Sequence, residues 1–133
     1  MTIEAALQGL RAALASMPGS MPTPLVFQPL PDTGLAHDHI RWVGTPWMAR
    51  LPKQSQMGLP PAENLAYQAA CFERAAASGH TPRLEAVLAP GPALQRGGLL
   101  VQAIEGRAAD AGRQDDLRAI AQALAAMHAL PVP

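Results

Sequence analysis

Large aromatic side chains are scarce in this sequence, making up 4% of its 133 residues. Alanine, leucine and proline are abundant instead, so a core built from them has few large anchors and could need a partner surface. Because 49% of the residues are hydrophobic, the chain is still long enough for one ordinary core. One hydrophobic core is therefore the expectation.

A second cysteine is also absent, since Cys71 is the only one in the chain. It has no intrachain disulfide partner, which fits a reducing compartment and favours a cytoplasmic location. It lies in a segment with helical spacing, and no neighbouring cation in the sequence would activate the thiol. We therefore expect a buried thiol and not a nucleophile.

An excess of charge of either sign is missing as well. Ten basic and ten acidic residues give a formal net charge of zero. No long-range field would draw the chain to nucleic acid or to an anionic membrane. Neither is an expected partner.

Long uninterrupted hydrophobic runs do not occur at the start of the chain, where an acidic residue appears early. Residues 1–20 therefore resemble neither a secretory signal nor a spanning helix. Apolar residues recur there at helical spacing, with Thr2 placed as an N-cap. We expect residues 1–20 to hold an amphipathic helix over 2–16, ahead of a domain formed by residues 21–133.

The remaining chain alternates between strand and helix patterns. Short apolar or alternating runs, bounded by proline and glycine, predict strands at residues 25–28, 39–43, 47–51, 83–88 and 98–104. Residues 31–34 (PDTG) predict a turn. Apolar residues at helical spacing predict one helix over 61–77 and another that begins at Asp115 or Asp116. The pattern indicates an α+β domain with a five-stranded antiparallel sheet, a helix packed against it, and helices at both ends.

This order of elements resembles the small lobe of the protein kinase-like fold. GLAHDHIRWVG (34–44) resembles the glycine turn and second strand of the aminoglycoside phosphotransferase and choline kinase-like superfamily. GLLVQAIEGR (98–107) resembles its fifth strand and hinge, and DLRAIAQALAAMHAL (116–130) resembles the helix that follows. Together the similar runs cover roughly residues 25–133.

The resemblance implies a cation on the third strand that polarises nucleotide phosphates, because phosphoryl transfer is catalysed mainly by positioning and charge. Arg50 falls at that position, and an arginine can bind phosphate with two hydrogen bonds. Lys53, three residues on and past Pro52, is the second choice and is expected in a loop. The alternative for both residues is a solvated strand end.

The same resemblance implies a carboxylate on the following helix, and it places Gln68 there. Glu63 and Glu73 lie five residues away on either side, so they project about 140° from Gln68 and cannot replace it. Gly34 is the only glycine in the expected glycine turn, where related loops use several to bring amides to phosphates.

By resemblance, the backbone of Gln102, Ala103 and Ile104 would meet the adenine of ATP. The sequence contains no H-x-D-x-x-x-x-N run, the family's source of a catalytic base and a metal-binding asparagine. We expect ATP binding to be weak, magnesium to bind only with a missing large lobe, and the chain to be inactive alone.

The histidines offer a further set of candidates. The run His37-Asp38-His39 invites a metal site, but only two imidazoles lie near each other and a strand turns neighbouring residues to opposite faces. His80 fits a loop or helix end, and His128 fits an ordinary packed or surface position. No metal site is expected.

A different class of function also fits the sequence. The missing catalytic run, the glutamine at position 68 and the amphipathic terminal helices fit a non-catalytic interaction module that associates with another lobe or with another copy of itself. An unrelated small α+β domain is a third alternative.

Overall fold

A computed structural model of the chain describes residues 2–17, 19, 24–31 and 34–132. The domain boundary expected at residues 20 and 21, and the centre of the predicted turn at residues 32 and 33, lie outside the described residues. Along the chain the elements are α1 (Ile3–Ala15), β1 (Phe27–Pro29), β2 (His37–Trp42), β3 (Trp47–Pro52), α2 (Pro61–Ala75), the 3₁₀ turn η1 (Ala76–Ser78), β4 (Leu84–Leu88), β5 (Gly98–Gln102) and α3 (Gln114–His128).

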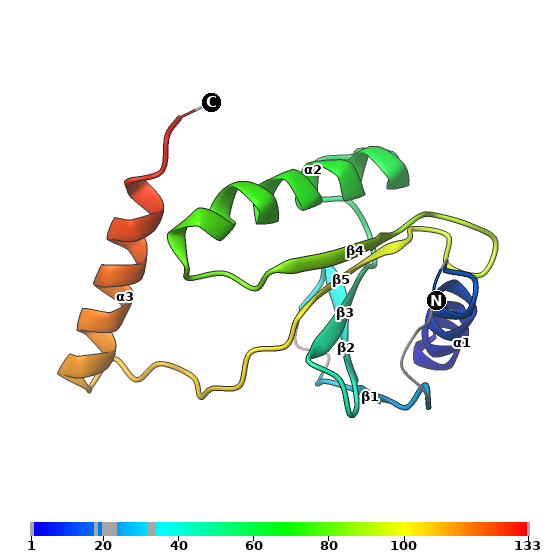
Figure 1. The fold of residues 1–133 in the computed structure, drawn as a ribbon, viewed down its shortest axis with the longest axis horizontal. Helices are drawn as coiled ribbons and strands as arrows, with labels where there is room; N and C mark the ends of the chain where they lie inside the picture. Colours follow the sequence, from blue (N-terminus) through cyan, green and yellow to red (C-terminus); the bar gives the residue numbers. More distant parts are fainter. Residues whose placement is uncertain (1, 18, 20–23, 32–33, 133) are drawn as a thin grey trace.

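The five strands form one antiparallel sheet in the order β1-β2-β3-β5-β4. The predicted α+β class with a five-stranded antiparallel sheet is confirmed. The predicted fifth strand was too long, because β5 ends at Gln102 instead of continuing to Ile104. The N–H of Ala103 donates to the carbonyl of Pro46 in the β2–β3 turn, after which the chain leaves the sheet towards α3 (Figure 1).

Helices cover both faces of the sheet, because its inner strands carry apolar side chains on both sides. Helix α1 covers one face and α2 the other (Figure 1). The α1 face contains the larger core, formed by Ala6, Leu10, Leu14, Ile40, Trp42, Ala49, Leu51, Leu88, Leu94 and Leu100. The α2 face contains a smaller core, formed by Leu65, Ala69, Leu99 and Val101.

The start of α1 agrees with the sequence prediction, since the Thr2 hydroxyl accepts a hydrogen bond from the N–H of Ala5 at 3.2 Å. This bond satisfies one of the amides that a helix start leaves without an intrahelical partner. A second link joins the helix to β1, where the Arg11 guanidinium lies 5.1 Å from the centroid of the Phe27 ring. The Arg11 contact and the buried apolar stripe hold α1 on the sheet.

Cys71 is exposed on α2, so the expectation of a buried thiol was wrong. The buried side of α2 is centred on Leu65 and Ala69. A helix turns about 100° per residue, so Cys71, two residues after Ala69, faces well away from the buried stripe.

Helix α3 stands apart from the sheet (Figure 1), and none of its residues is buried. Its start is tied to the preceding chain by Arg107, whose guanidinium donates to both carboxylate oxygens of Asp116 at 2.7 Å. The same carboxylate accepts the N–H of Asp110 at 2.9 Å. The apolar side chains on the helix remain exposed, namely Leu117, Ile120, Leu124 and Met127.

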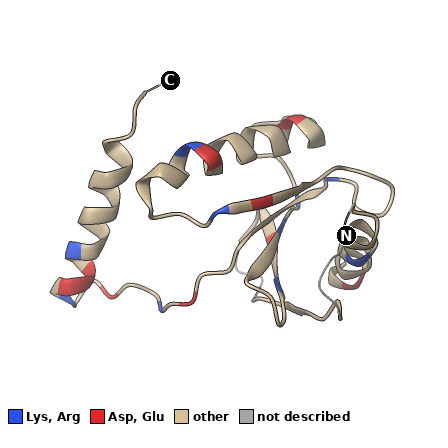
Figure 2. Ribbon diagram, in the orientation of Figure 1, with Lys and Arg blue, Asp and Glu red and all other residues tan. Residues whose placement is uncertain are grey.

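None of the helices in the described part of the chain combines the length and the hydropathy needed to cross a membrane. Basic and acidic residues are interspersed over the elements and do not gather on one of them (Figure 2).

Candidate functional site

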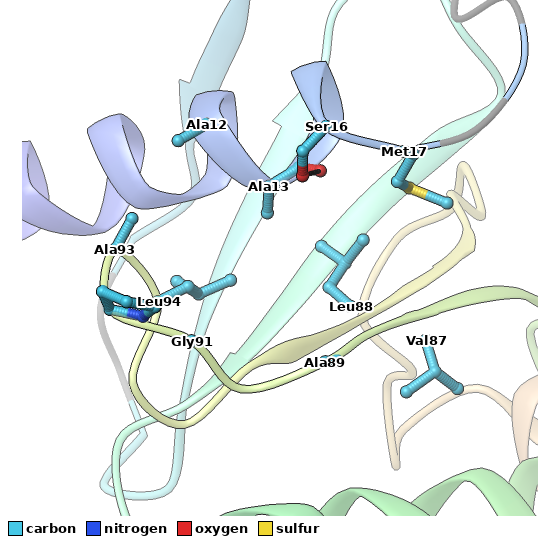
Figure 3. Close-up of a pocket in the computed structure, with 11 residues that line it drawn as sticks. Ala12, Ala13, Ser16, Met17, Val87, Leu88, Ala89, Gly91, Ala93 and Leu94 are labelled. Atoms are coloured by element: carbon cyan, nitrogen blue, oxygen red, sulfur yellow. Dashed lines mark hydrogen bonds between the residues drawn. The ribbon is translucent and has the colours of Figure 1, made fainter.

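A hollow of about 450 Å³ lies between the end of α1 and the connection that follows β4. Figure 3 shows Ser16 and Met17 on the helix side of it and Leu88 and Leu94 across from them. Ser16 supplies the single polar side chain among its lining residues, and that hydroxyl already donates to the carbonyl of Ala13 at 3.0 Å. This hollow therefore offers apolar contact but no group suited to acid–base or nucleophilic chemistry.

Two histidines and an arginine lie together on the other face of the sheet, which α2 covers. His37 and His39 are two residues apart on β2, so their side chains leave the strand on the same side. Arg50 pairs with His39 across the β2–β3 ladder, and cross-strand partners share a face. The ring centroids of the two histidines are 6.1 Å apart. These three residues are called the His-Arg cluster below.

Helix α2 supplies the neighbours of the His-Arg cluster. The carboxamide oxygen of Gln68 accepts a hydrogen bond from Nε2 of His37 at 3.1 Å, so Nε2 carries the hydrogen of the neutral ring. The guanidinium of Arg50 lies over the ring of Phe72, 5.6 Å from its centroid, as in a cation–π contact. The Nε atom of Arg50 is buried and has no hydrogen-bond partner among the described residues.

The electrostatics of the cluster favour neutral imidazoles. Burial lowers the pKa of Arg50, and no Asp or Glu of the described segments forms an ion pair with it. Burial also lowers the pKa of His37 and of His39, and the positive charge of Arg50 lowers both further. The hydrogen bond to Gln68 and the charge of Asp38 act in the opposite direction on His37 and His39, respectively. Both rings are therefore mainly neutral at pH 7.

Gln68 lies on the sheet-facing side of α2, on the same face as Arg50, but its hydrogen bond goes to His37. Glu63 and Glu73 are both exposed. The helix thus presents an amide to this face of the sheet at the position where the resemblance implied a carboxylate.

Lys53 and Gly34 come together at the end of β3, on the opposite side of the strand from the His-Arg cluster. Lys53 Nζ donates to the carbonyl of Gly34 at 3.0 Å and lies 3.7 Å from a carboxylate oxygen of Asp38. Asp38 sits between the two histidines of β2 in sequence and so projects from the opposite face. A Cβ atom at Gly34 would meet nothing within 4 Å, so no close contact requires glycine there. Of the two candidate cations, Arg50 is the one that faces α2.

The three proposed hinge residues follow directly from β5. The N–H groups of Gln102 and Ala103 are occupied, donating to the carbonyls of Arg83 and Pro46 at 2.8 Å each. The N–H of Ile104 makes no hydrogen bond within the described segments, and the residue is 61% exposed. Of the three amides, Ile104 therefore has the free donor that a base would need.

No group of three or more His, Cys, Asp or Glu residues among those described is gathered closely enough to hold a metal ion. His80 follows the 3₁₀ turn η1, and His128 is the last residue of α3. Neither histidine is near the His-Arg cluster in the sequence, and no described hydrogen bond joins either of them to it.

His37 and His39 are the members of this site that the sequence reasoning assigned no binding role. In the sequence, the run from His37 to His39 suggests only a metal site, and no metal site is expected there. The signal that could have found them is their alternation on β2 combined with the short hairpin to β3, which fixes Arg50 across from His39.

Comparisons of the chain with protein-family models, with curated proteins and with solved structures found no match.

Proposed function

We propose that this chain is the nucleotide-facing small lobe of a small-molecule phosphotransferase of the aminoglycoside or choline kinase-like type. The observation that carries the proposal is the position of Arg50, a half-buried cation that faces α2 with a buried, unpartnered Nε and no ion-paired carboxylate among the described residues. A guanidinium in that state suits a phosphate group, which accepts several charge-assisted hydrogen bonds.

The order of elements gives further support, because the helix between the third and fourth strands and the free amide of Ile104 after the fifth occur where the resemblance implies them. The described residues thus fit a nucleotide at two points, a cation for phosphate and a strand end for the base. Three features fit less well, namely the single glycine at position 34, the amide of Gln68 in place of a carboxylate, and the occupied N–H groups of Gln102 and Ala103.

The proposal for these 133 residues is nucleotide binding and not catalysis by the chain alone, because they contain no H-x-D-x-x-x-x-N run. A catalytic base and magnesium ligands would come from a second lobe. With half of the pocket supplied elsewhere, binding of ATP by this lobe is weak.

Replacing Arg50 with alanine is expected to weaken ATP binding roughly 10- to 100-fold, the cost of one charged hydrogen-bonding group. Adenosine, which has no phosphate, should bind the variant and the parent chain equally. NMR titrations of both ligands measure the two affinities. Arg118→Ala is the matched control, because Arg118 is exposed on α3 and pairs only with Asp115 among the described residues. Equal ATP affinity for parent chain and Arg50→Ala would contradict the assignment.

The second candidate is a non-catalytic interaction module. It is favoured by α3, which has no buried residue and carries four exposed apolar side chains. Exposed apolar groups of this kind commonly mark contact surfaces.

A further inference from the structure

Two members of the His-Arg cluster, His37 and His39, border small hollows that are distinct from the apolar hollow beside α1, whereas Arg50 lines neither of them. One, of about 200 Å³, is lined by His37 and His39 together with the segment from Gly34 to Ala36 and the side chain of Gln56. The other, of about 100 Å³, lies between His37 and Gln68. A water molecule occupies about 30 Å³ in the liquid, so the larger hollow has room for a group the size of a phosphate.

The charged and titratable groups around this hollow are mostly cationic or can become so. Strand β2 supplies His37 and His39 to the lining. Arg50 of β3, across from His39 but outside the lining, adds a positive charge that acts on both rings. Asp38 and Lys53 act on His39 from the opposite face, with opposite signs. On the α2 side, the polar neighbours in the adjoining hollow are uncharged, namely Asn64, Tyr67 and Gln68.

A bound cation is the less suitable occupant. A metal ion would have to sit beside the positive charge of Arg50, and Nε2 of His37 already donates to Gln68. An anion meets the opposite situation, because it would compensate Arg50 and could accept hydrogen bonds from imidazolium rings.

We infer that His37 and His39 join Arg50 in a phosphate-binding site, and that both imidazoles take up protons when the phosphate chain of a nucleotide binds. The inference rests on the proposed function, in that it assigns new residues to the nucleotide site. It is narrower than the proposed function, because it concerns the binding of the polyphosphate group and not the binding of the base.

The proton balance of the step is simple. In the free chain the imidazoles are mainly neutral, and His37 carries its hydrogen on Nε2 towards Gln68. A bound phosphate attracts a proton from solvent onto the other ring nitrogen, Nδ1 of His37, and likewise protonates the ring of His39. Each proton taken up forms one N–H bond on the imidazole and breaks one O–H bond of a hydronium ion or water molecule, and no bond between heavy atoms changes. Between the free and the bound pKa of an imidazole, the uptake of its proton makes the affinity for phosphate fall about tenfold for each unit by which the pH rises.

The experiment follows the ring signals of all four histidines by NMR across pH 5 to 8.5, without ligand and with tripolyphosphate, adenosine or ATP. We expect tripolyphosphate and ATP to raise the pKa of His37 and His39. The ring chemical shifts of His80 and His128 at a given pH should be the same with and without ligand. Binding of tripolyphosphate should weaken as the pH rises above the pKa values of the free imidazoles, which burial and Arg50 hold below the ordinary 6.5. His37→Gln and His39→Gln should each make this pH dependence shallower, whereas the control His128→Gln should keep it.

The outcomes separate this inference from the proposed function. If tripolyphosphate leaves both histidine pKa values unchanged while adenosine shifts the signals of residues 102–104, the inference is wrong and the nucleotide proposal stands. If tripolyphosphate acts as expected but adenosine does not bind and ATP binds no better than tripolyphosphate, the site takes free polyphosphate and the nucleotide proposal fails. If Zn²⁺ binds the two imidazoles and tripolyphosphate does not bind them, the site is a cation-binding site and the inference is overturned. The parent-chain titration decides these cases even if a histidine variant does not fold.

Discussion

Replacing Trp42 with alanine is expected to lower the free energy of unfolding by about 3–5 kcal/mol, the usual cost of truncating a fully buried aromatic residue. Trp42 is the largest side chain in the core on the α1 face, with 0% of its surface exposed. Its ring packs against those of Phe27 and Trp47, with centroids 6.1 and 5.6 Å away. Since domains are typically stable by only 5–15 kcal/mol, the variant should lose a large part of its stability.

Urea denaturation followed by circular dichroism measures this change. Trp42→Phe is the matched comparison and should cost much less, because it keeps a ring and removes an indole N–H that is buried without a described partner. Leu124→Ala on α3, at a position 50% exposed, should change stability little. A small effect of Trp42→Ala, similar to that of Leu124→Ala, would contradict the packing of α1 on the sheet.

Gly97→Ala is expected to lower the free energy of unfolding by roughly 2–5 kcal/mol, from backbone strain and overpacking together. Gly97 has a φ angle of +62°, in the left-handed region that favours glycine. A Cβ atom there would also collide with the backbone carbonyl of Leu88 and with the side chain of Leu65. The collision cannot be relieved by a flexible side chain alone, because one of the two partners is backbone.

Gly44→Ala separates the two causes. Gly44 also has a positive φ angle, +80°, but a Cβ atom would meet nothing within 4 Å. Gly44→Ala should therefore lower the free energy of unfolding by about 1–2 kcal/mol, from backbone strain alone. Equal losses of stability for the two alanine variants in urea denaturation would show that the β4–β5 connection is not packed closely at Gly97.

The elements that the sequence predicted well are those set by local patterns. The helix starts at Thr2 and Pro61 follow from capping and from the fixed φ angle of proline. The β2–β3 hairpin follows from an alternating run and a mostly apolar run around a short turn. The prediction for β5 was wrong only at the end of the strand. There the N–H of Ala103 donates to the carbonyl of Pro46, a contact between segments far apart in sequence.

The candidate site was predicted less completely, because its contacts depend on side chains from different elements. The resemblance pointed to Arg50, but not to its contact with Phe72. The sequence pattern placed Gln68 on the helix, but not the hydrogen bond that it accepts from His37. For α3, the spacing of apolar residues predicted an apolar face. The spacing does not show whether another element covers that face, and none of the residues of α3 is buried.

The most direct test of the nucleotide proposal is a titration of ATP with magnesium into the isotopically labelled chain, followed by its backbone amide signals. The proposal predicts shifts that saturate at millimolar concentration and cluster at Gly34, Arg50 and Ile104. The amides of α3 should remain unchanged. Absence of shifts at those positions, or concentration-dependent shifts confined to α3, would contradict the nucleotide lobe and favour the interaction module.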